Sequence, residues 1–174
     1  MKIMQILKGA LIGGVVMLIM GVAVQLFPWG FNVVEPLPDG AALIDVPGTP
    51  LPNAMALIEG NADEGRAASF VAFSDPAWHS IPRKLGYDLA MQVAIAAIFS
   101  MILLATASLR NRERVGIIFG MAVAASIGCF LPDWNWWGFS FRYVVGASVN
   151  LLLVWTAVGY VLARWVLKST HPAE

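Results

Sequence analysis

The sequence predicts an all-α membrane protein: a bundle of four transmembrane helices with one extracytoplasmic loop region of about 50 residues. The first observation behind this prediction is composition, because 59% of the 174 residues are hydrophobic and only 13% are charged. Soluble proteins have about a quarter of their residues charged, so this excess of apolar side chains needs a non-aqueous environment. The second observation is that the apolar residues fall into four long runs. We expect one membrane domain over residues 1–174, with spans at about 9–31, 86–109, 115–132 and 143–165.

Each of the four runs is long enough to cross a bilayer as a helix. A helix rises 1.5 Å per residue, so roughly 30 Å of hydrocarbon takes about 20 residues. A helix also satisfies its own backbone hydrogen bonds, as a segment surrounded by lipid must. Charged residues mark the limits of the runs in chain order: Lys8 and Glu35, Asp88 and Arg110, Arg114 and Asp133, and Arg142 and Arg164.

The lysines and arginines sort by side of the membrane. One side holds seven of the eleven cations, namely Lys2, Lys8, Arg110, Arg112, Arg114, Arg164 and Lys168. The other side holds four cations together with nine of the eleven carboxylates. Cytoplasmic ends and loops carry the positive excess in membrane proteins. The pattern therefore predicts that both termini are cytoplasmic and that residues 32–85 lie on the opposite side.

The predicted loop, residues 32–85, is too small and too poor in periodic apolar residues to build a core of its own. Asn53 is a suitable N-cap for a short helix from Ala54 to Glu59. Ser80 and Pro82 are typical of the start of a helix, here the one that continues into the second span. We expect an apolar patch of the loop to rest on the bundle or on lipid: Phe70, Val71, Phe73 and Trp78.

Small residues indicate where the spans approach one another. Helices in lipid associate through close packing at small side chains, since lipid is as apolar as leucine. The third span has such residues at intervals of four: Gly116, Gly120, Ala124 and Gly128. Similar pairs occur in the other spans, at Gly9 and Gly13, Ala90 and Ala94, and Gly159 and Ala163. We expect the stripe on the third span to pack inside the bundle, with homo-oligomerisation as the alternative.

The sequence contains no pattern with a defined chemistry. None of the apolar runs carries an ionisable group, whose burial in lipid costs several kcal/mol unless it has a function. The most polar side chains within them are Gln92 and Asn150, for which interhelical hydrogen bonding is the leading interpretation. His79 and His171 fall on opposite predicted sides, and Cys129 is the only cysteine. We therefore expect no catalytic residue, no metal and no cofactor, and the zero net charge argues against nucleic acid as a partner.

One dense group of residues stands out between the last two spans. Three tryptophans occur within four positions, and a carboxylate and an arginine flank them: Asp133, Trp134, Asn135, Trp136, Trp137 and Arg142. The structural interpretation is an aromatic belt around a tight turn. The functional interpretation is a surface that binds a lipid headgroup or a partner protein, because tryptophan and arginine concentrate binding energy. These six residues are the candidate interaction surface.

The same residues carry a family resemblance. The segment Trp134-Asn135-Trp136-Trp137-Gly138-Phe139, the preceding Leu131-Pro132 and a first span ending in Phe27-Pro28-Trp29 resemble an uncharacterised family of small bacterial inner-membrane proteins. The resemblance covers the first 30 residues and about residues 115 to 165, and the loop matches poorly. It implies a multi-pass protein of the bacterial inner membrane. Since the family has no assigned activity, the resemblance supports the architecture and leaves the function open.

Two functional hypotheses follow from the sequence. The leading one is a non-enzymatic accessory or partner-binding subunit, whose surroundings are the lipid bilayer and whose partner is another protein or a second copy. The alternative is a small lipid- or solute-handling protein with a site between the helices near Gln92 and Asn150. A polar cavity opening toward one leaflet would favour the alternative, and a solid bundle with an exposed aromatic patch would favour the first.

Overall fold

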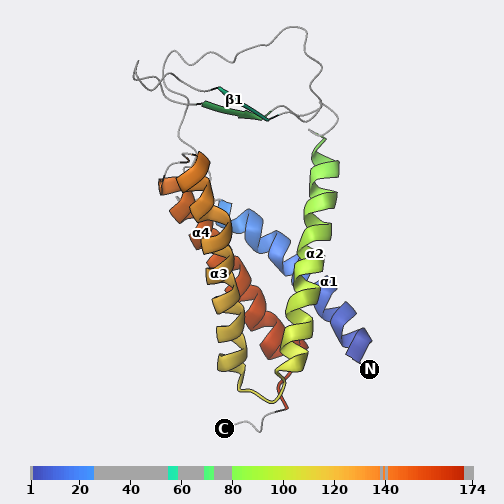
Figure 1. Ribbon diagram of the computed structural model, residues 1–174. Coiled ribbons are helices and arrows are strands. Elements are labelled where there is room, and N and C mark those ends of the chain that lie inside the picture. The colour runs from blue at the N-terminus through green and yellow to red at the C-terminus, as the bar shows by residue number, and fades with distance from the viewer. Residues whose placement is uncertain are drawn as a thin grey trace. The chain divides into compact units, whose positions relative to one another are not determined.

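A computed structural model describes residues 2–25, 55–58, 69–72, 80–137, 139 and 141–170. It contains four long helices: α1 (Lys2–Gln25), α2 (Ile81–Ala105), α3 (Asn111–Trp137) and α4 (Phe141–Val161) (Figure 1). A π-helical segment, η4 (Leu162–Val166), continues α4. All four helices are long and apolar enough to cross a membrane. The fold class is therefore confirmed: this is a small multi-pass membrane protein with four candidate spans.

Several helices run farther than the apolar segments alone predicted, whereas the expected end of the first span, residues 26–31, lies outside the described residues. α1 begins at Lys2 rather than near residue 9, and α2 begins at Ile81, directly after Ser80. α3 extends from Asn111 to Trp137 and so includes Pro132, which cannot donate the backbone hydrogen bond of that position. A transmembrane helix can continue beyond the hydrocarbon, and its ends there can carry charged residues. Charged residues therefore mark the end of the apolar run but not the end of the helix.

The expected short helix over residues 54–59 is wrong. Residues Met55–Ile58 form strand β1, which pairs antiparallel with strand β2 (Ser69–Ala72) in a two-stranded sheet. Met55 lies opposite Ala72, and Ile58 lies opposite Ser69. Cross-strand pairing gives hydrogen-bond partners to backbone N–H and C=O groups that a single capped helical turn would leave unpaired. The expected apolar patch of the loop stays a prediction, because Phe73 and Trp78 lie outside the described residues.

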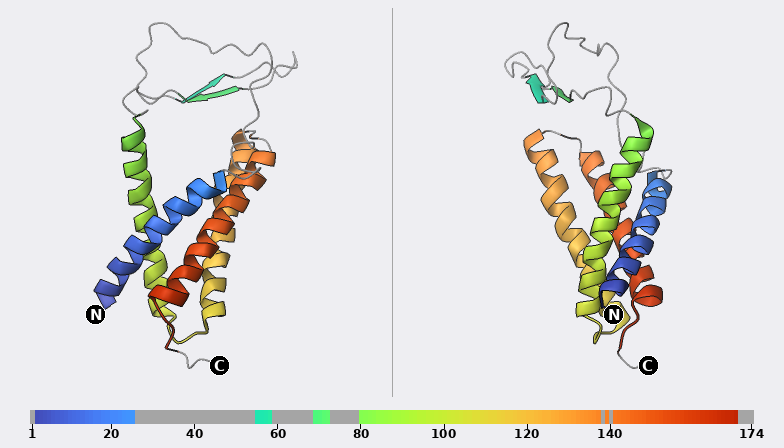
Figure 2. Two further views of the ribbon diagram at one scale, coloured as in Figure 1. Left: turned by 180° about the vertical axis from the view of Figure 1, so that it is seen from behind. Right: turned by 90° about the vertical axis from the view of Figure 1, so that its right-hand side faces the viewer.

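α3 and α4 pack side by side along their lengths and form the closest helix pair (Figure 2). A methyl group added to Gly159 of α4 would lie 2.9 Å from the side chain of Ile118 of α3, so the two backbones approach closely. This confirms the close approach predicted at Gly159 and Ala163, both of which are buried. α3 buries one face, at intervals of four residues: Arg114, Ile118, Ala122 and Ser126.

The small-residue stripe of α3 lies on its other face. Gly116, Gly120 and Gly128 are exposed, and an added Cβ at any of them would meet nothing within 4 Å. Ala124 is exposed as well. The expectation that this stripe packs inside the bundle is wrong, because residues two positions apart on a helix point in nearly opposite directions. The larger residues Ile118 and Arg114 fill the interface with α4 instead. The alternative, homo-oligomerisation, stays a prediction.

α1 crosses α2 obliquely, and glycines of α1 make the crossing close (Figures 1 and 2). A Cβ added to Gly9 would meet the Ser100 side chain. A Cβ added to Gly13 would lie 2.8 Å from the Ala96 Cβ, and one added to Gly14 would lie 3.0 Å from the Val93 backbone. The predicted contact surface at Gly9 and Gly13 is therefore confirmed. Its expected counterpart on α2 is wrong, since Ala90 and Ala94 are exposed and Ala96 is buried.

The core of the bundle is apolar and draws on every span. Its fully buried side chains come from all four helices and η4: Met17, Phe99, Leu103, Ile118, Val158 and Leu162. The Phe99 ring meets the Trp155 ring edge to face, with centroids 5.1 Å apart, which joins α2 to α4. This packing fixes the ends of the helices relative to one another.

Candidate functional site

A buried arginine joins three helices at the end of the bundle where α1 begins and η4 ends. Arg114 is fully buried. Its Nη2 donates to the carbonyl oxygens of Leu103 at 2.9 Å and Leu167 at 2.7 Å. Its Nη1 donates to Asn111 Oδ1 at 3.0 Å and to the Ala163 carbonyl oxygen at 3.4 Å. One side chain of α3 therefore binds the ends of α2 and of the α4–η4 helix.

Helix geometry explains why an arginine suits this position. The last turn of a helix leaves carbonyl oxygens without backbone partners, and these oxygens form the negative end of the helix dipole. Leu103 lies in the last turn of α2, and Ala163 and Leu167 lie within and just after η4. The planar guanidinium offers several donors in a fixed arrangement, so a single cation can satisfy carbonyls from two helix ends.

The chain after η4 closes over the same end. The single proton of Ser169 Oγ is shared between the carbonyl oxygens of Ala107 at 2.9 Å and Leu109 at 2.7 Å. The backbone N–H of Thr170 also donates to the Ala107 oxygen, at 2.8 Å. These bonds hold residues 167–170 against the turn between α2 and α3.

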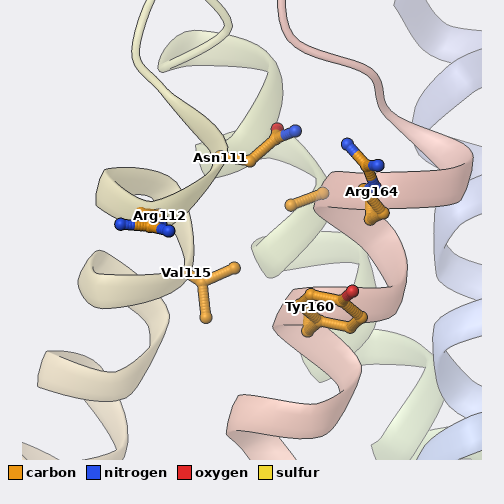
Figure 3. Close-up of a pocket in the computed structure, with 6 residues that line it drawn as sticks. Asn111, Arg112, Val115, Tyr160 and Arg164 are labelled. Atoms are coloured by element: carbon orange, nitrogen blue, oxygen red, sulfur yellow. The ribbon is translucent and has the colours of Figure 1, made fainter. Parts of the chain in front are cut away.

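A cavity of about 250 Å³ lies beside this network, between the first turn of α3 and the end of the α4–η4 helix (Figure 3). Six residues line it: Asn111, Arg112, Val115, Tyr160, Ala163 and Arg164. Arg112 and Arg164 are exposed, and their guanidinium groups lie apart on opposite sides of the cavity (Figure 3). Val115 and the buried Ala163 supply an apolar wall. We call this cavity with its six lining residues the basic pocket.

The residues around the basic pocket combine apolar side chains with arginines and interfacial aromatic rings. Its lining surface is almost entirely apolar, although two of its six residues are arginines and none is acidic. The Tyr160 and Trp165 rings meet edge to face with centroids 6.0 Å apart, and both are exposed. Tyrosine and tryptophan favour the membrane–water interface, where an apolar ring and a polar edge are both accommodated.

The aromatic residues singled out in the sequence do not form the predicted turn, because Asp133 to Trp137 are the last residues of α3. Trp136 is 78% exposed and Trp134 is 50% exposed, while Asn135 and Arg142 are also exposed and Asp133 is half-buried. The Trp134 ring meets Phe141 edge to face at 6.0 Å. The side chain of Trp137 lies outside the described part. Trp134, Asn135 and Trp136 therefore form an exposed polar and aromatic end of α3.

The polar side chains within the spans have different surroundings. Gln92 donates to the Asp88 carboxylate at 3.3 Å within α2, which is a local bond within one helix. Asn150 Oδ1, Ser126 Oγ and Thr156 Oγ1 are buried without a hydrogen-bond partner among the described residues. No group of three potential metal ligands occurs in the ranges that the structure describes.

Comparisons of the chain with known protein families, with curated proteins and with solved structures find no match. The resemblance to a bacterial inner-membrane family therefore stays a prediction.

Sequence reasoning missed both the role of Arg114 and the basic pocket. It treated Arg114 as a flanking charge of the third span, whereas the side chain is buried and bonded to α2 and η4. Arg112 and Arg164 are 52 positions apart, so only the antiparallel packing of α3 and α4 brings them to one cavity. The available signal was the gathering of seven cations on one predicted side.

Proposed function

We propose that this integral membrane protein is non-enzymatic and binds the headgroup of an anionic membrane lipid in the basic pocket. The observation that carries the proposal is a cavity between two transmembrane helices that is lined by Arg112 and Arg164 and contains no acidic side chain. This is a form of the lipid-handling hypothesis, with the site at the cation-rich end of the bundle rather than near Gln92 and Asn150.

Arginine chemistry supports a phosphate-containing ligand. A guanidinium presents parallel N–H donors that match the spacing of phosphate oxygens, so each arginine can bind bidentately. Asn111 and Arg112 are the first two residues of α3, where free backbone N–H groups and the positive end of the helix dipole also attract anions. Arg114 donates to carbonyl oxygens of Ala163 and Leu167 at the negative end of η4. These bonds reduce the repulsion between the carbonyl oxygens and a bound anion.

The position of the pocket supports a lipid rather than a soluble anion. Tyr160 lines the pocket and pairs with Trp165, and such rings mark the headgroup level. Basic pockets between transmembrane helices on the cytoplasmic side are typical binding sites for acidic headgroups. Acyl chains of a bound lipid could then lie along the apolar surface that α3 and α4 expose to the bilayer, which includes Phe119 and Leu153.

The test compares lipid nanodiscs of two compositions. Wild-type protein in nanodiscs of phosphatidylglycerol should unfold at a temperature several degrees higher than in phosphatidylcholine, because bound anionic lipid stabilises the folded state. Replacing both pocket arginines, Arg112→Gln with Arg164→Gln, should abolish most of that difference. Lys168→Gln is the matched control, since Lys168 is an exposed cation at the same end that does not line the pocket.

A loss of the phosphatidylglycerol effect in Lys168→Gln as large as in the double variant would mean that general surface charge, not the pocket, attracts the lipid. An unchanged effect in the double variant would rule the pocket out. The effect should also weaken at high salt, because Arg112 and Arg164 are exposed and salt screens exposed charges.

A second candidate function is a partner-binding or accessory subunit that works through the exposed end of α3. The observation that favours it is the exposure of Trp136, Trp134 and Phe141 next to Asp133 and Arg142. Aromatic residues with arginine are typical of the anchors of protein interfaces. Affinity purification in mild detergent followed by mass spectrometry tests it, and recovery of the chain alone as a monomer would contradict it.

The proposed location is the bacterial inner membrane, with both termini and the basic pocket in the cytoplasmic leaflet. The excess of cations at this end supports the orientation. In a Cys129→Ser background, Ser108→Cys in the turn between α2 and α3 should react with a membrane-impermeant maleimide only after cells are opened. Ala62→Cys should react in intact cells, and labelling of both from the same side would overturn this orientation.

A further inference from the structure

The hydrogen bonds of η4 are shifted by one residue from those of an ordinary α-helix. The backbone N–H of Leu167 donates to the carbonyl oxygen of Leu162 at 2.7 Å, five residues back. In an α-helix the same N–H would donate to the carbonyl oxygen of Ala163, four residues back. Turns of the π type are rare, and they occur mostly as single turns within α-helices, frequently at functional sites. The shift leaves the Ala163 oxygen without its α-helical donor.

Arg114 takes the place of that donor. Its Nη1 donates to the Ala163 oxygen at 3.4 Å, and its Nη2 donates to the Leu167 oxygen at 2.7 Å. All three residues are buried, and a buried carbonyl oxygen needs a hydrogen-bond donor from the protein. The π register of η4 and the position of the Arg114 guanidinium therefore depend on each other.

A ring contact on the helix surface marks the same register. Each residue of an α-helix adds about 100° of rotation, so residues five apart point about 140° away from each other. In a turn closed by a bond between residues five apart, those residues lie on the same side. The rings of Tyr160 and Trp165 meet edge to face with centroids 6.0 Å apart. This pair is therefore a marker of the π register.

The position of residues 167–170 also follows from the register. The side chain of Leu167 is buried under α1, 3.5 Å from the place of a Cβ added to Gly9. Farther along, the backbone N–H of Thr170 donates to the carbonyl oxygen of Ala107 at 2.8 Å. A return to the α register would turn Leu167 and the residues after it about the helix axis, which would break this contact and this bond.

We infer that Arg114 is a positioning residue that locks η4 in the π register and thereby holds residues 167–170 on the turn between α2 and α3. When the guanidinium is withdrawn, the Leu167 N–H returns to the Ala163 oxygen, η4 becomes α-helical and residues 167–170 leave the turn. Ala163 and Arg164 line the basic pocket, so the two registers give that pocket different walls. The inference concerns the conformation of this end of the bundle and does not depend on lipid binding there.

Fluorine NMR of the full-length protein in neutral detergent, with 5-fluorotryptophan in place of tryptophan, tests the inference at two places. The Trp165 resonance reports the register through its contact with Tyr160. The Trp155 resonance reports whether the bundle is folded, because its ring meets that of Phe99 in the core. Trp155→Phe and Trp165→Phe assign the two resonances.

Deletion of Val166 supplies the reference for the α register. The deletion removes one residue between Leu162 and Leu167, so the bond between them becomes the ordinary bond of an α-helix. Tyr160 and Trp165 keep their separation along the chain but lose the π turn, so the Trp165 resonance should shift. An unshifted Trp165 resonance in this variant would overturn the inference, because the register would then not set the position of the ring.

Replacement of Arg114 then shows what holds the register. In Arg114→Gln the Trp165 resonance should move to its position in the deletion variant while the Trp155 resonance stays in place. The Thr170 amide should exchange with deuterium roughly tenfold faster, because local opening sets the exchange rate. Arg114→Lys keeps the charge without the planar donors and should show both Trp165 resonances. Lys168→Gln, at an exposed cation of the same end, should change neither measurement.

Two results with the Arg114 variants would overturn the inference. One is an unchanged Trp165 resonance together with a native Trp155 resonance in Arg114→Gln, since η4 would then hold its register without the guanidinium. The other is loss of the native Trp155 resonance in both Arg114→Gln and Arg114→Lys, since Arg114 would then hold the whole bundle rather than the register of η4. A Trp165 shift and faster Thr170 exchange with the Trp155 resonance unchanged support the inference.

Discussion

Replacing Arg114 with methionine should destabilise the bundle more than any other single substitution considered for this chain. The change removes the hydrogen bonds to Leu103, Ala163 and Leu167 and leaves three buried carbonyl oxygens without a donor. Each orphaned buried group costs about 1–3 kcal/mol, while removing a buried charge returns part of that cost. We expect a net loss of about 3 kcal/mol in the free energy of unfolding, measured by denaturant or thermal unfolding in detergent followed by circular dichroism.

Two further variants sharpen this prediction. Arg114→Lys keeps the charge, but one ammonium group cannot reach carbonyls of both α2 and η4 in the way that a planar guanidinium does, so it should fall between wild type and Arg114→Met. Lys168→Met removes an exposed cation from the same end and should change stability by less than about 0.5 kcal/mol. A methionine variant as stable as wild type would contradict the role assigned to Arg114 in joining the helices.

Replacing Gly14 with leucine should force α1 away from α2. An added Cβ would lie 2.5 Å from Val93 Cγ2 and 3.0 Å from the Val93 backbone, which cannot move aside as a flexible side chain can. Overpacking of this kind costs about 1–3 kcal/mol. The expected result is a loss of stability in that range, together with easier proteolysis of the chain near the α1–α2 crossing.

Gly21→Leu is the matched control on the same helix, because nothing lies within 4 Å of an added Cβ there. Both substitutions replace a glycine by a helix-favouring residue, so they share any gain in helix propensity. Equal stability of the Gly14 and Gly21 variants would show that α1 does not cross α2 as described.

The spans were predictable because a bilayer imposes a length and a polarity on any helix that crosses it. The runs bounded by Asp88 and Arg110, or by Arg142 and Arg164, each correspond to one observed helix. Helix ends were less predictable, since charged or polar residues such as Lys2 and Asn111 can extend a helix beyond the hydrocarbon. The strand at Met55–Ile58 depends on pairing with Ser69–Ala72, which no local helix signal reveals.

The candidate site was hidden from sequence reasoning for a related reason. Small residues at Gly116 and Gly120 indicate a surface able to approach another helix, but not which helix or whether it belongs to the same chain. The structure turns that face outward and places Ile118 and Arg114 inside. Once α3 and α4 are antiparallel neighbours, Arg112 and Arg164 reach one cavity, and this follows from tertiary packing alone.

Photocrosslinking with a phospholipid that carries a diazirine in its headgroup tests the central claim most directly. With full-length protein in nanodiscs, an anionic probe should label peptides containing residues 111–115 and 160–164, which contain the lining of the basic pocket. Labelling should be much weaker with a phosphatidylcholine probe and in the variant that combines Arg112→Gln with Arg164→Gln. Equal labelling by both probes, or labelling confined to other helices, would contradict a headgroup site between α3 and α4.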